Sequence, residues 1–239
     1  ERLASLGTVA AGISHEIKNP IHIIQSSASA ILELMNAETL SKEKVVQFTQ
    51  MIHRASTRTN IIIRDMLDLA SDRKTSVSTD LNELIQYAFN LIRHSLIEPN
   101  KILLNPIFDL EELAKPIFLS KQEIQRVFVN MFENSVHYLM EKLKHNKDFK
   151  PKLLINTKVE SNEVIINIED NGKGISKEIQ SKIFDPFFTT KKPRSGTGLG
   201  LSITRDIIVR EGGTISVESI PEKGTSFTIR LPYKVKSES

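Results

Sequence analysis

The sequence contains no cysteine and no tryptophan, and aromatic residues make up only 6% of its 239 positions. Without cysteine the chain forms no disulfide bond, has no thiolate nucleophile and offers no sulfur ligand to a metal. The scarcity of aromatics predicts an aliphatic core, which 39% hydrophobic residues can supply for one or two domains. Because thiol-free chains suit a reducing compartment, we expect a cytoplasmic location.

The chain also lacks a strong charge, carrying a formal net charge of +3, and no apolar run approaches the ~20 residues that span a bilayer. With no arginine-rich stripe interleaved with aromatics, its basic pI gives little support for a nucleic-acid partner, and we expect none. Glu1 begins inside a helical pattern without an initiator Met. We therefore expect a fragment whose upstream region is missing, and membrane anchoring of the full-length protein stays open.

Residues 1–74 are expected to form two long helices joined by a short polar turn at 36–41. In the second helix, small or apolar residues recur three and four positions apart at Val45, Phe48, Ile52, Ala55, Thr59, Ile62, Met66 and Leu69. This spacing is the seam of a coiled coil or bundle. The first helix has a looser seam, formed by Leu3, Leu6, Ala10, Ile13, Ile17, Ile24, Ile31 and Leu34. Two amphipathic helices bury little surface alone, so we predict a homodimeric four-helix bundle.

One histidine of the first helix has an unusual set of neighbours. His15 lies two positions before the seam residue Ile17, so its side chain is predicted to face solvent. Asn19 shares that face four residues on, and Glu16 lies on its flank. Pro20 is expected to bend the helix close to this site. A zinc-binding H-E-x-x-H helix is excluded because Asn19 stands at the second histidine position, and taken alone His15 is an ordinary surface residue.

Residues 75–239 mix helices and strands, after a Ser/Thr-rich boundary at 75–79 that we expect to act as a hinge. Helices are predicted from Asp80 to about Ser95, from Ser120 to about Lys144 and after Gly200, with Asp80 and Ser120 as N-caps, and Ser41 caps the second helix of the hairpin. Strands are predicted at 101–104, 116–119, 152–159, 163–169, 214–219 and 226–231. The fold class is therefore α+β, a helical hairpin followed by an α/β two-layer sandwich with a mostly antiparallel sheet.

Polar and glycine-rich motifs cluster in this second part. Asn130 and Asn134 lie one turn apart on one helix face, where their amide oxygens can share a magnesium ion. Asp170 ends a strand before the tight turn of residues 171–174, and its carboxylate can accept a hydrogen bond from an amine such as that of adenine. Residues 196–201 bring bare backbone amides to a helix N-terminus, which predicts a triphosphate site.

Each of these motifs has an ordinary structural explanation when taken alone, since glycines occur in flexible turns and paired asparagines on polar helix faces. Two other nucleotide folds are not supported. No G-x-x-x-x-G-K-[ST] segment is present, so the chain is not a P-loop protein. The glycine-rich segment also lacks the strand and the acidic residue that a Rossmann fold requires.

In order and spacing, the motifs resemble those of the sensor histidine kinases. Residues 14–20 resemble the phosphoacceptor box of that family, and most closely its nitrogen-regulatory branch. Residues 130–134, 170–174, 184–188 and 196–201 resemble its asparagine, glycine and phenylalanine boxes. The resemblance covers essentially the whole chain. It implies a dimerization and phosphotransfer domain at 1–74, an ATP-binding domain of the gyrase, Hsp90 and MutL type at 75–239, and a sensor region upstream.

The resemblance implies a role for each matching residue. His15 would accept the γ-phosphoryl group of ATP and pass it to an aspartate of a response regulator receiver domain. Glu16 would take up or orient the imidazole proton, and Asn19 would orient a water that removes phosphate from the regulator. Asn134, helped by Asn130, would hold Mg²⁺. The residues implied at ATP are Asn130, Asn134, His137, Tyr138, Asp170, Gly172, Gly174, Lys191, Thr197, Gly198, Leu199, Gly200, Leu201 and Thr225.

Two other functions fit the same ATP-binding motifs. An ATP-hydrolysing clamp related to gyrase and Hsp90 would place a glutamate where Asn130 stands, because an amide cannot act as a base. A pseudokinase scaffold would bind ATP without transferring phosphate, although no motif here is degraded.

Overall fold

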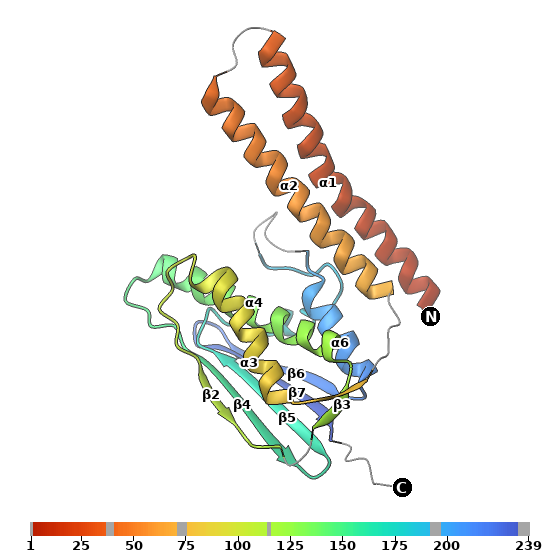
Figure 1. Cartoon of the computed structure of the whole chain (residues 1–239), viewed down its shortest axis with the longest axis vertical. Helices are drawn as coiled ribbons and strands as arrows, with labels where there is room; N and C mark the ends of the chain where they lie inside the picture. The colour runs from red at the N-terminus through yellow and green to blue at the C-terminus, as the bar shows by residue number, and fades with distance from the viewer. Residues whose placement is uncertain (1, 37–40, 71–75, 114–115, 192–196, 234–239) are drawn as a thin grey trace. The chain divides into compact units, whose positions relative to one another are not determined.

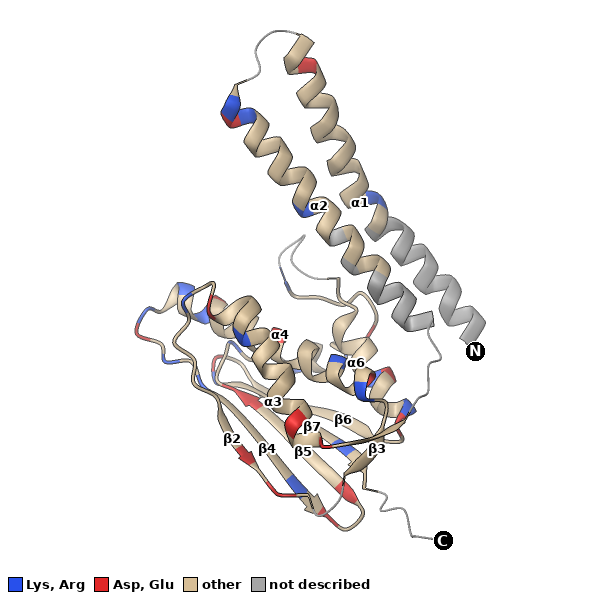
Figure 2. Ribbon diagram, viewed as in Figure 1, with Lys and Arg blue, Asp and Glu red and all other residues tan. Residues whose placement is uncertain are grey.

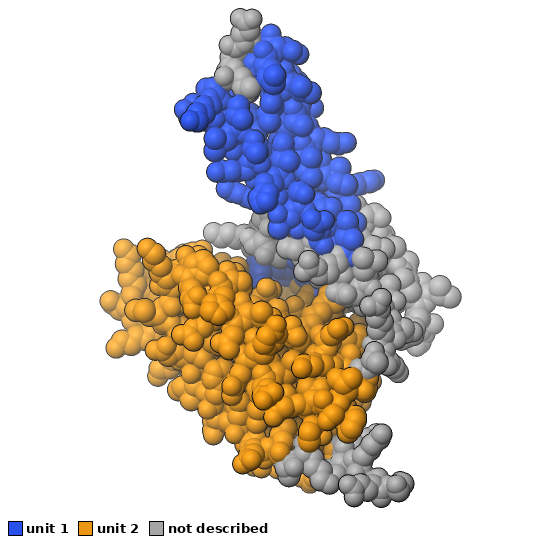
Figure 3. All heavy atoms as spheres, viewed as in Figure 1, with its two compact units in different colours: residues 1–72, 189–199 blue, residues 73–188, 200–239 orange. Residues whose placement is uncertain are grey.

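The computed structural model describes residues 2–36, 41–70, 76–113, 116–191 and 197–233, without the side chains of residues 2–16, 58, 61 and 64–70. The chain divides into two compact units, residues 1–72 with 189–199 and residues 73–188 with 200–239 (Figure 3). The predicted domain boundary between residues 74 and 75 lies outside the described residues. Among the helices in the described ranges, none is both long and apolar enough to cross a membrane.

Two antiparallel helices make up most of the first unit, α1 (Arg2–Asn36) and α2 (Lys42–Ala70) (Figure 1). The predicted seam forms their contact, since Ala55 and Ile62 of α2 are buried. Pro20 and Ser27 continue the seam of α1 and are buried as well. Val45, in the first turn of α2, is an exception, because 37% of it is exposed.

The start of α2 is capped as the sequence predicts. The hydroxyl oxygen of Ser41 accepts a hydrogen bond from the backbone N–H of Lys44 at 3.4 Å, which satisfies one of the free donors of the first turn. The seam positions from residue 3 to residue 13 and from 66 to 69 lie outside the described side chains. The bend of α1 at Pro20 stays a prediction.

The second unit is built on a five-stranded sheet. Its strands run in the order β2 (Ile107–Leu110), β4 (Leu153–Glu160), β5 (Glu163–Asp170), β7 (Gly224–Pro232) and β6 (Thr214–Ile220). β2 pairs in parallel with β4, whereas the other neighbours are antiparallel. A second, two-stranded sheet pairs β1 (Val77–Thr79) with β3 (Ile117–Leu119).

Helices cover one face of the larger sheet (Figure 1), namely α3 (Leu81–Ile92), α4 (Lys121–His145) and α6 (Gly200–Arg210), while the short α5 (Lys177–Gln180) lies beside β6. Alternate side chains of β5 point into this layer, and Val164, Ile166 and Ile168 are fully buried. Charged residues of both signs are interspersed over the unit (Figure 2). The predicted two-layer α/β sandwich is confirmed.

The strand predicted at residues 101–104 is wrong. Lys101 has a φ of 53°, in the left-handed region, and the N–H of Leu104 donates to the carbonyl of Ile102 at 3.1 Å. This turn geometry is incompatible with a strand, and Leu103 is 92% exposed. The apolar run therefore belongs to a loop, and the edge strand β2 begins later, at Ile107.

The hinge predicted at residues 75–79 is also wrong for its larger part. Val77–Thr79 form β1, whose residues pair with Ile117–Leu119 of β3. Thr79 is only 3% exposed, because its side chain faces the interior of the unit. A paired strand cannot serve as a free linker, so a hinge would have to lie before Val77.

The N-terminal ends of α3 and α4 are capped in different ways. Asp80 caps α3 as predicted, accepting a hydrogen bond from the N–H of Glu83 at 3.0 Å. Ser120 occupies the N-cap position of α4, but its side chain makes no capping hydrogen bond. Instead a carboxylate oxygen of Glu211, which follows α6, accepts from the N–H of Ser120 at 3.1 Å. The carboxylate favours this helix end electrostatically, so the predicted serine cap is replaced by an acidic one.

The end of α3 falls close to the prediction. The helix continues past Ile92 as a single π-helical turn, η1 (Arg93–Ile97), so the chain stays helical through the predicted end at Ser95.

Candidate functional site

One face of α4 carries four of the predicted site residues. Asn130, Asn134, His137 and Tyr138 are all partly buried and recur at helical spacing. The side-chain N–H of Asn130 donates to the carbonyl of Gly200 at 3.2 Å, which joins α4 to the first residue of α6. This bond uses the donor of the amide, and the oxygen of the same group is the atom that a magnesium ion would take.

Asp170 lies at the end of β5 and is only 6% exposed. One carboxylate oxygen accepts from the hydroxyl of Ser135 at 3.1 Å, and the other accepts from the N–H of Gly172 at 2.9 Å. Burial raises the pKa of the Asp170 carboxyl from its usual 3.8 to about 6, while hydrogen bonds from Gly172, Ser135 and Thr225 act in the opposite direction. A buried acceptor with fixed orientation is therefore available at the end of β5, the central strand of the sheet.

Thr225 is the register partner of Asp170 on the neighbouring strand β7 and is 7% exposed. Its hydroxyl oxygen lies 2.9 Å from that of Ser219 on β6, and the N–H of Ile175 donates to the same Ser219 oxygen at 2.8 Å. The pairing of β5, β7 and β6 thus brings Thr225 beside the predicted adenine-binding carboxylate.

The turn after Asp170 is packed against α4 and the β6–β7 turn. A Cβ added to Gly172 would come within 2.7 Å of a carboxylate oxygen of Asp170, and it would lie 3.4 Å from the Cβ of Tyr138, an ordinary contact. Gly174 has a φ of 70°, and a Cβ added there would overlap the carbonyl oxygen of Ile220. The two glycines are required by close packing at these points, and this packing brings Tyr138 next to the turn.

Lys191 and the predicted phosphate-binding residues 197–201 do not all belong to the same unit. Gly200 and Leu201 open α6 in the second unit. Lys191 and residues 197–199 belong to the first unit, in which the N–H of Leu199 donates to the hydroxyl of Thr197 at 3.3 Å. Gly198 has a φ of 69°, which favours glycine. The roles of Lys191, Thr197, Gly198 and Leu199 at a nucleotide stay predictions.

The phosphoacceptor residues lie on α1. His15 and Glu16 are within the helix, and the predicted exposure of His15 lies outside the described side chains. Asn19 is exposed, as is His22, which follows it on the same face. The described part of this face is thus open to solvent.

Sequence reasoning missed three residues that build the site. Ser135 and Ser219 hold Asp170 and Thr225, and Lys142 bonds to the turn after Asp170. Ser135 follows Asn134 directly, but a serine in a helix gives no sign of a partner 35 positions away. Lys142 falls in a run of charged residues near the helix end, which reads as a solvated face.

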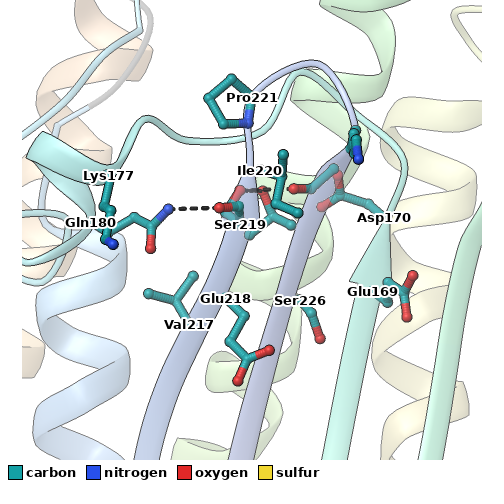
Figure 4. Close-up of a pocket in the computed structure, with 13 residues that line it drawn as sticks. Glu169, Asp170, Lys177, Gln180, Val217, Glu218, Ser219, Ile220, Pro221 and Ser226 are labelled. Atoms are coloured by element: carbon teal, nitrogen blue, oxygen red, sulfur yellow. Dashed lines mark hydrogen bonds between the residues drawn. The ribbon is translucent and has the colours of Figure 1, made fainter.

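A surface hollow of about 720 Å³ opens at the ends of β5, β6 and β7 (Figure 4). Asp170 and Thr225 contribute to its lining, together with Gln180, whose side-chain N–H donates to the carbonyl of Ser219 at 2.8 Å. Asn130 and Asn134 are not among its lining residues. The hollow therefore reaches Asp170 and Thr225, where adenine binding is predicted, and not the asparagines that are predicted to hold a metal ion.

Taken together, the sandwich fold, the buried carboxylate at the end of β5 and the paired asparagines of α4 define an ATP-binding domain. Residues 120–235 match the family described as "Histidine kinase-, DNA gyrase B-, and HSP90-like ATPase", and residues 5–74 match the "His Kinase A (phospho-acceptor) domain". The chain belongs to the sensor histidine kinases of two-component systems.

Similar proteins agree with this assignment. Sensor histidine kinase ZraS of Salmonella typhimurium is 32% identical over 239 residues, all of this chain and 48% of ZraS. Signal transduction histidine-protein kinase AtoS of Escherichia coli K12 is 31% identical over 97% of this chain and 36% of its own length. The chain thus spans about half or less of these relatives. The narrower resemblance to nitrogen-regulatory kinases stays a prediction.

A solved structure extends the similarity to both parts of the chain. The crystal structure of histidine kinase ThkA in complex with response regulator protein TrrA has a TM-score of 0.74 and 27% sequence identity. The match covers 98% of this chain and 64% of that one, so the hairpin and the sandwich occur together in both proteins.

Proposed function

We propose that this chain phosphorylates itself on His15 with ATP and then transfers the phosphoryl group to an aspartate of a response regulator. The observation that carries the proposal is the presence, in one chain, of a phosphoacceptor domain and an ATP-binding domain in which Asp170 is a buried, oriented acceptor. Neither domain could perform the transfer alone. The ThkA–TrrA complex supports a receiver domain as the partner.

ATP supplies the phosphoryl group, and the residues of the chain position it. Asp170 would accept a hydrogen bond from the exocyclic amine of adenine, with Thr225 beside it. Asn134 and Asn130 offer the amide oxygens that suit Mg²⁺, a hard cation that keeps several of its waters. The backbone amides of residues 198–201 would hold the phosphates at the start of α6.

On the other domain, the neutral imidazole of His15 would be the nucleophile. Glu16 would receive or orient the imidazole proton as the N–P bond forms and the bond to ADP breaks. Catalysis then rests on positioning and charge stabilisation, because phosphoryl transfer needs little other covalent help. Since ATP is made and used in the cytoplasm, we place this part of the protein there.

A hydrolytic clamp and a non-transferring scaffold are the competing functions. A clamp needs a carboxylate at the position of Asn130 to activate water, and the amide there instead donates to Gly200. A scaffold would keep the pocket and lose the transfer. Both are less well supported than the kinase, since the relatives described above are named histidine kinases.

Incubation with γ-labelled ATP distinguishes the three functions. We expect acid-labile label on the protein, complete loss of that label in His15→Gln, and no loss in His22→Gln, an exposed histidine of the same helix. Release of free phosphate without protein label would indicate a clamp, and ATP binding with neither product would indicate a scaffold. Label that persists in His15→Gln would contradict the assignment of the acceptor.

Asn19 is proposed to orient a water that attacks the phosphorylated aspartate of the regulator. Asn19→Ala is expected to slow dephosphorylation of a labelled receiver domain roughly a hundredfold. The reason is that a reaction slows by about this factor when the attacking water is no longer held in position. Phosphorylation of His15 should persist. Gln25→Ala, at another exposed position of α1, serves as the control. Equal dephosphorylation rates for Asn19→Ala and the parent chain would exclude this role.

The hairpin is proposed to dimerize. Exposed apolar side chains occur on the two helices at Ile21, Leu32, Met35, Val45, Val46 and Ile63. Two helices leave these groups in water, whereas a four-helix bundle with a second copy would bury part of them.

A further inference from the structure

Lys142 makes a concentrated set of hydrogen bonds near the end of α4. Its ammonium nitrogen donates to the backbone carbonyls of Asn171 at 3.0 Å, Gly172 at 2.9 Å and Glu222 at 2.7 Å. Since a lysine has three N–H donors, these three acceptors use them all. The ring of Phe149 also lies 4.9 Å from the same nitrogen, within the range of a cation–π contact.

The three carbonyls come from two different turns. Asn171 and Gly172 follow β5, whereas Glu222 lies between β6 and β7. A backbone hydrogen bond joins the same two turns directly, from the N–H of Glu222 to the carbonyl of Lys173 at 2.7 Å. Lys142 therefore ties α4 to both turns through a single charged group.

Both turns determine the position of Asp170. The N–H of Gly172 holds one oxygen of the Asp170 carboxylate, and a Cβ added to Gly224 would overlap the backbone carbonyl of Asp170. A movement of either turn would thus reorient the carboxylate that is proposed to recognise adenine. Lys142 links α4 to both of these turns through a charged group.

Three carbonyl oxygens that converge on one point form a site for a cation. Each carbonyl carries partial negative charge, and a positive group that lies among them relieves their mutual repulsion. All three hydrogen-bond acceptors of Lys142 are backbone carbonyls, so the lysine acts here as a cation fixed to the helix and not as half of a salt bridge.

We propose that Lys142 is the positioning residue of the adenine site, a tethered cation that fixes the two turns around Asp170 and so sets nucleotide affinity. The inference rests on the proposed binding of ATP at Asp170. It assigns Lys142 no contact with the nucleotide, so the effect of Lys142 on nucleotide affinity is exerted through the two turns.

The test uses the whole chain and variants at position 142. Lys142→Met keeps an unbranched side chain up to Cε and removes the ammonium group. Lys142→Ala leaves room for propylammonium, which has the missing carbons and the ammonium group. Lys144→Met changes an exposed lysine of the same helix and is the control. Two quantities are measured. One is the dissociation constant of a fluorescent, non-hydrolysable ATP analogue, and the other is the hydrogen exchange rate of the Gly172 and Glu222 amides in nucleotide-free protein.

We expect about a tenfold increase in the dissociation constant for both Lys142 variants and faster exchange of the two amides. Propylammonium should restore analogue binding and slow amide exchange in Lys142→Ala, whereas tetramethylammonium, which has no N–H, should restore neither. Lys144→Met should resemble the parent chain in both measurements. Tight analogue binding by Lys142→Met, or rescue by tetramethylammonium, would overturn the role of Lys142. A parent chain that binds no analogue would instead overturn the proposed function, and the exchange data would still decide whether Lys142 holds the turns.

Discussion

Asp170→Asn is expected to weaken ATP binding roughly a hundredfold, since a hydrogen bond to a charged group contributes about 1.5–3 kcal/mol. The substitution should leave the local structure intact. The amide oxygen can still accept from the N–H of Gly172, and the new NH₂ group can donate to the hydroxyl of Ser135, which also acts as an acceptor. What is lost is the charged acceptor for the amine of adenine.

The raised pKa gives this prediction a pH dependence. With a pKa of about 6 in the folded chain, Asp170 binds its proton as the pH falls through 6. ATP affinity of the parent chain should therefore decline below this pH, while that of Asp170→Asn stays flat. Titration of binding between pH 5 and 8, with Asp109→Asn at an exposed position of β2 as the control, measures the difference.

The folding stability of the parent chain should rise as the pH falls, whereas its ATP affinity should decline. The folded pKa lies above the unfolded value of 3.8, so the folded state holds the extra proton between pH 3.8 and about 6. Stability of the parent chain is thus greatest below this window and falls as the pH rises through it. At pH 7 the variant should unfold with a free energy higher by on the order of 2 kcal/mol, measured by urea denaturation. A variant that is less stable than the parent, with unchanged ATP affinity, would contradict the assigned role of Asp170.

The fold was predictable where the pattern of side chains has a strict period. The strands β4 and β5 alternate cleanly and end at polar turns, so the sequence indicated both to within a residue or two. The helix seam repeats every three and four positions, and its buried members Ala55 and Ile62 lie where predicted. Local hydrogen-bonding rules also sufficed for the caps formed by Ser41 and Asp80.

Prediction failed where a contact distant in sequence decides the structure. Val77–Thr79 read as a linker because a polar Ser/Thr segment forms a strand only when β3 is available to pair with it. Ser120 was predicted to cap α4, but Glu211, 91 residues away, supplies the carboxylate. Both outcomes depend on how elements pack, which no local pattern records.

The candidate site shows the same division. Recognisable motifs or strand ends identify four residues of the candidate site, Asn130, Asn134, Asp170 and Thr225. The fold of the second unit brings Asp170 and Thr225 side by side. The residues that orient them, such as Ser135 and Lys142, have no motif, because their role lies in contacts 29 to 80 positions away. Sequence therefore predicts the groups that would touch a nucleotide better than the groups that hold them.

Gly174→Ala is expected to destabilise the second unit by roughly 3–5 kcal/mol, among the largest effects of a single substitution. Two causes add. The φ of 70° disfavours any residue with a Cβ, by about 1–2 kcal/mol, and the new Cβ would overlap the carbonyl oxygen of Ile220. The clash is with backbone, which the bond between Glu222 and Lys173 holds in place.

Gly212→Ala separates these two causes. Gly212 has a φ of 81°, but its added Cβ would meet only a side-chain carbon of Pro232 at 3.4 Å, an ordinary contact. Urea denaturation should therefore show a loss of about 1–2 kcal/mol for Gly212→Ala and a clearly larger loss for Gly174→Ala. If the two variants lose the same stability, the turns around Asp170 yield easily, and a glycine at 174 is needed for its conformation alone. If Gly174→Ala loses clearly more stability than Gly212→Ala, a glycine is required at position 174 so that the two backbone turns can meet. The contact between these turns is the arrangement that orients Asp170.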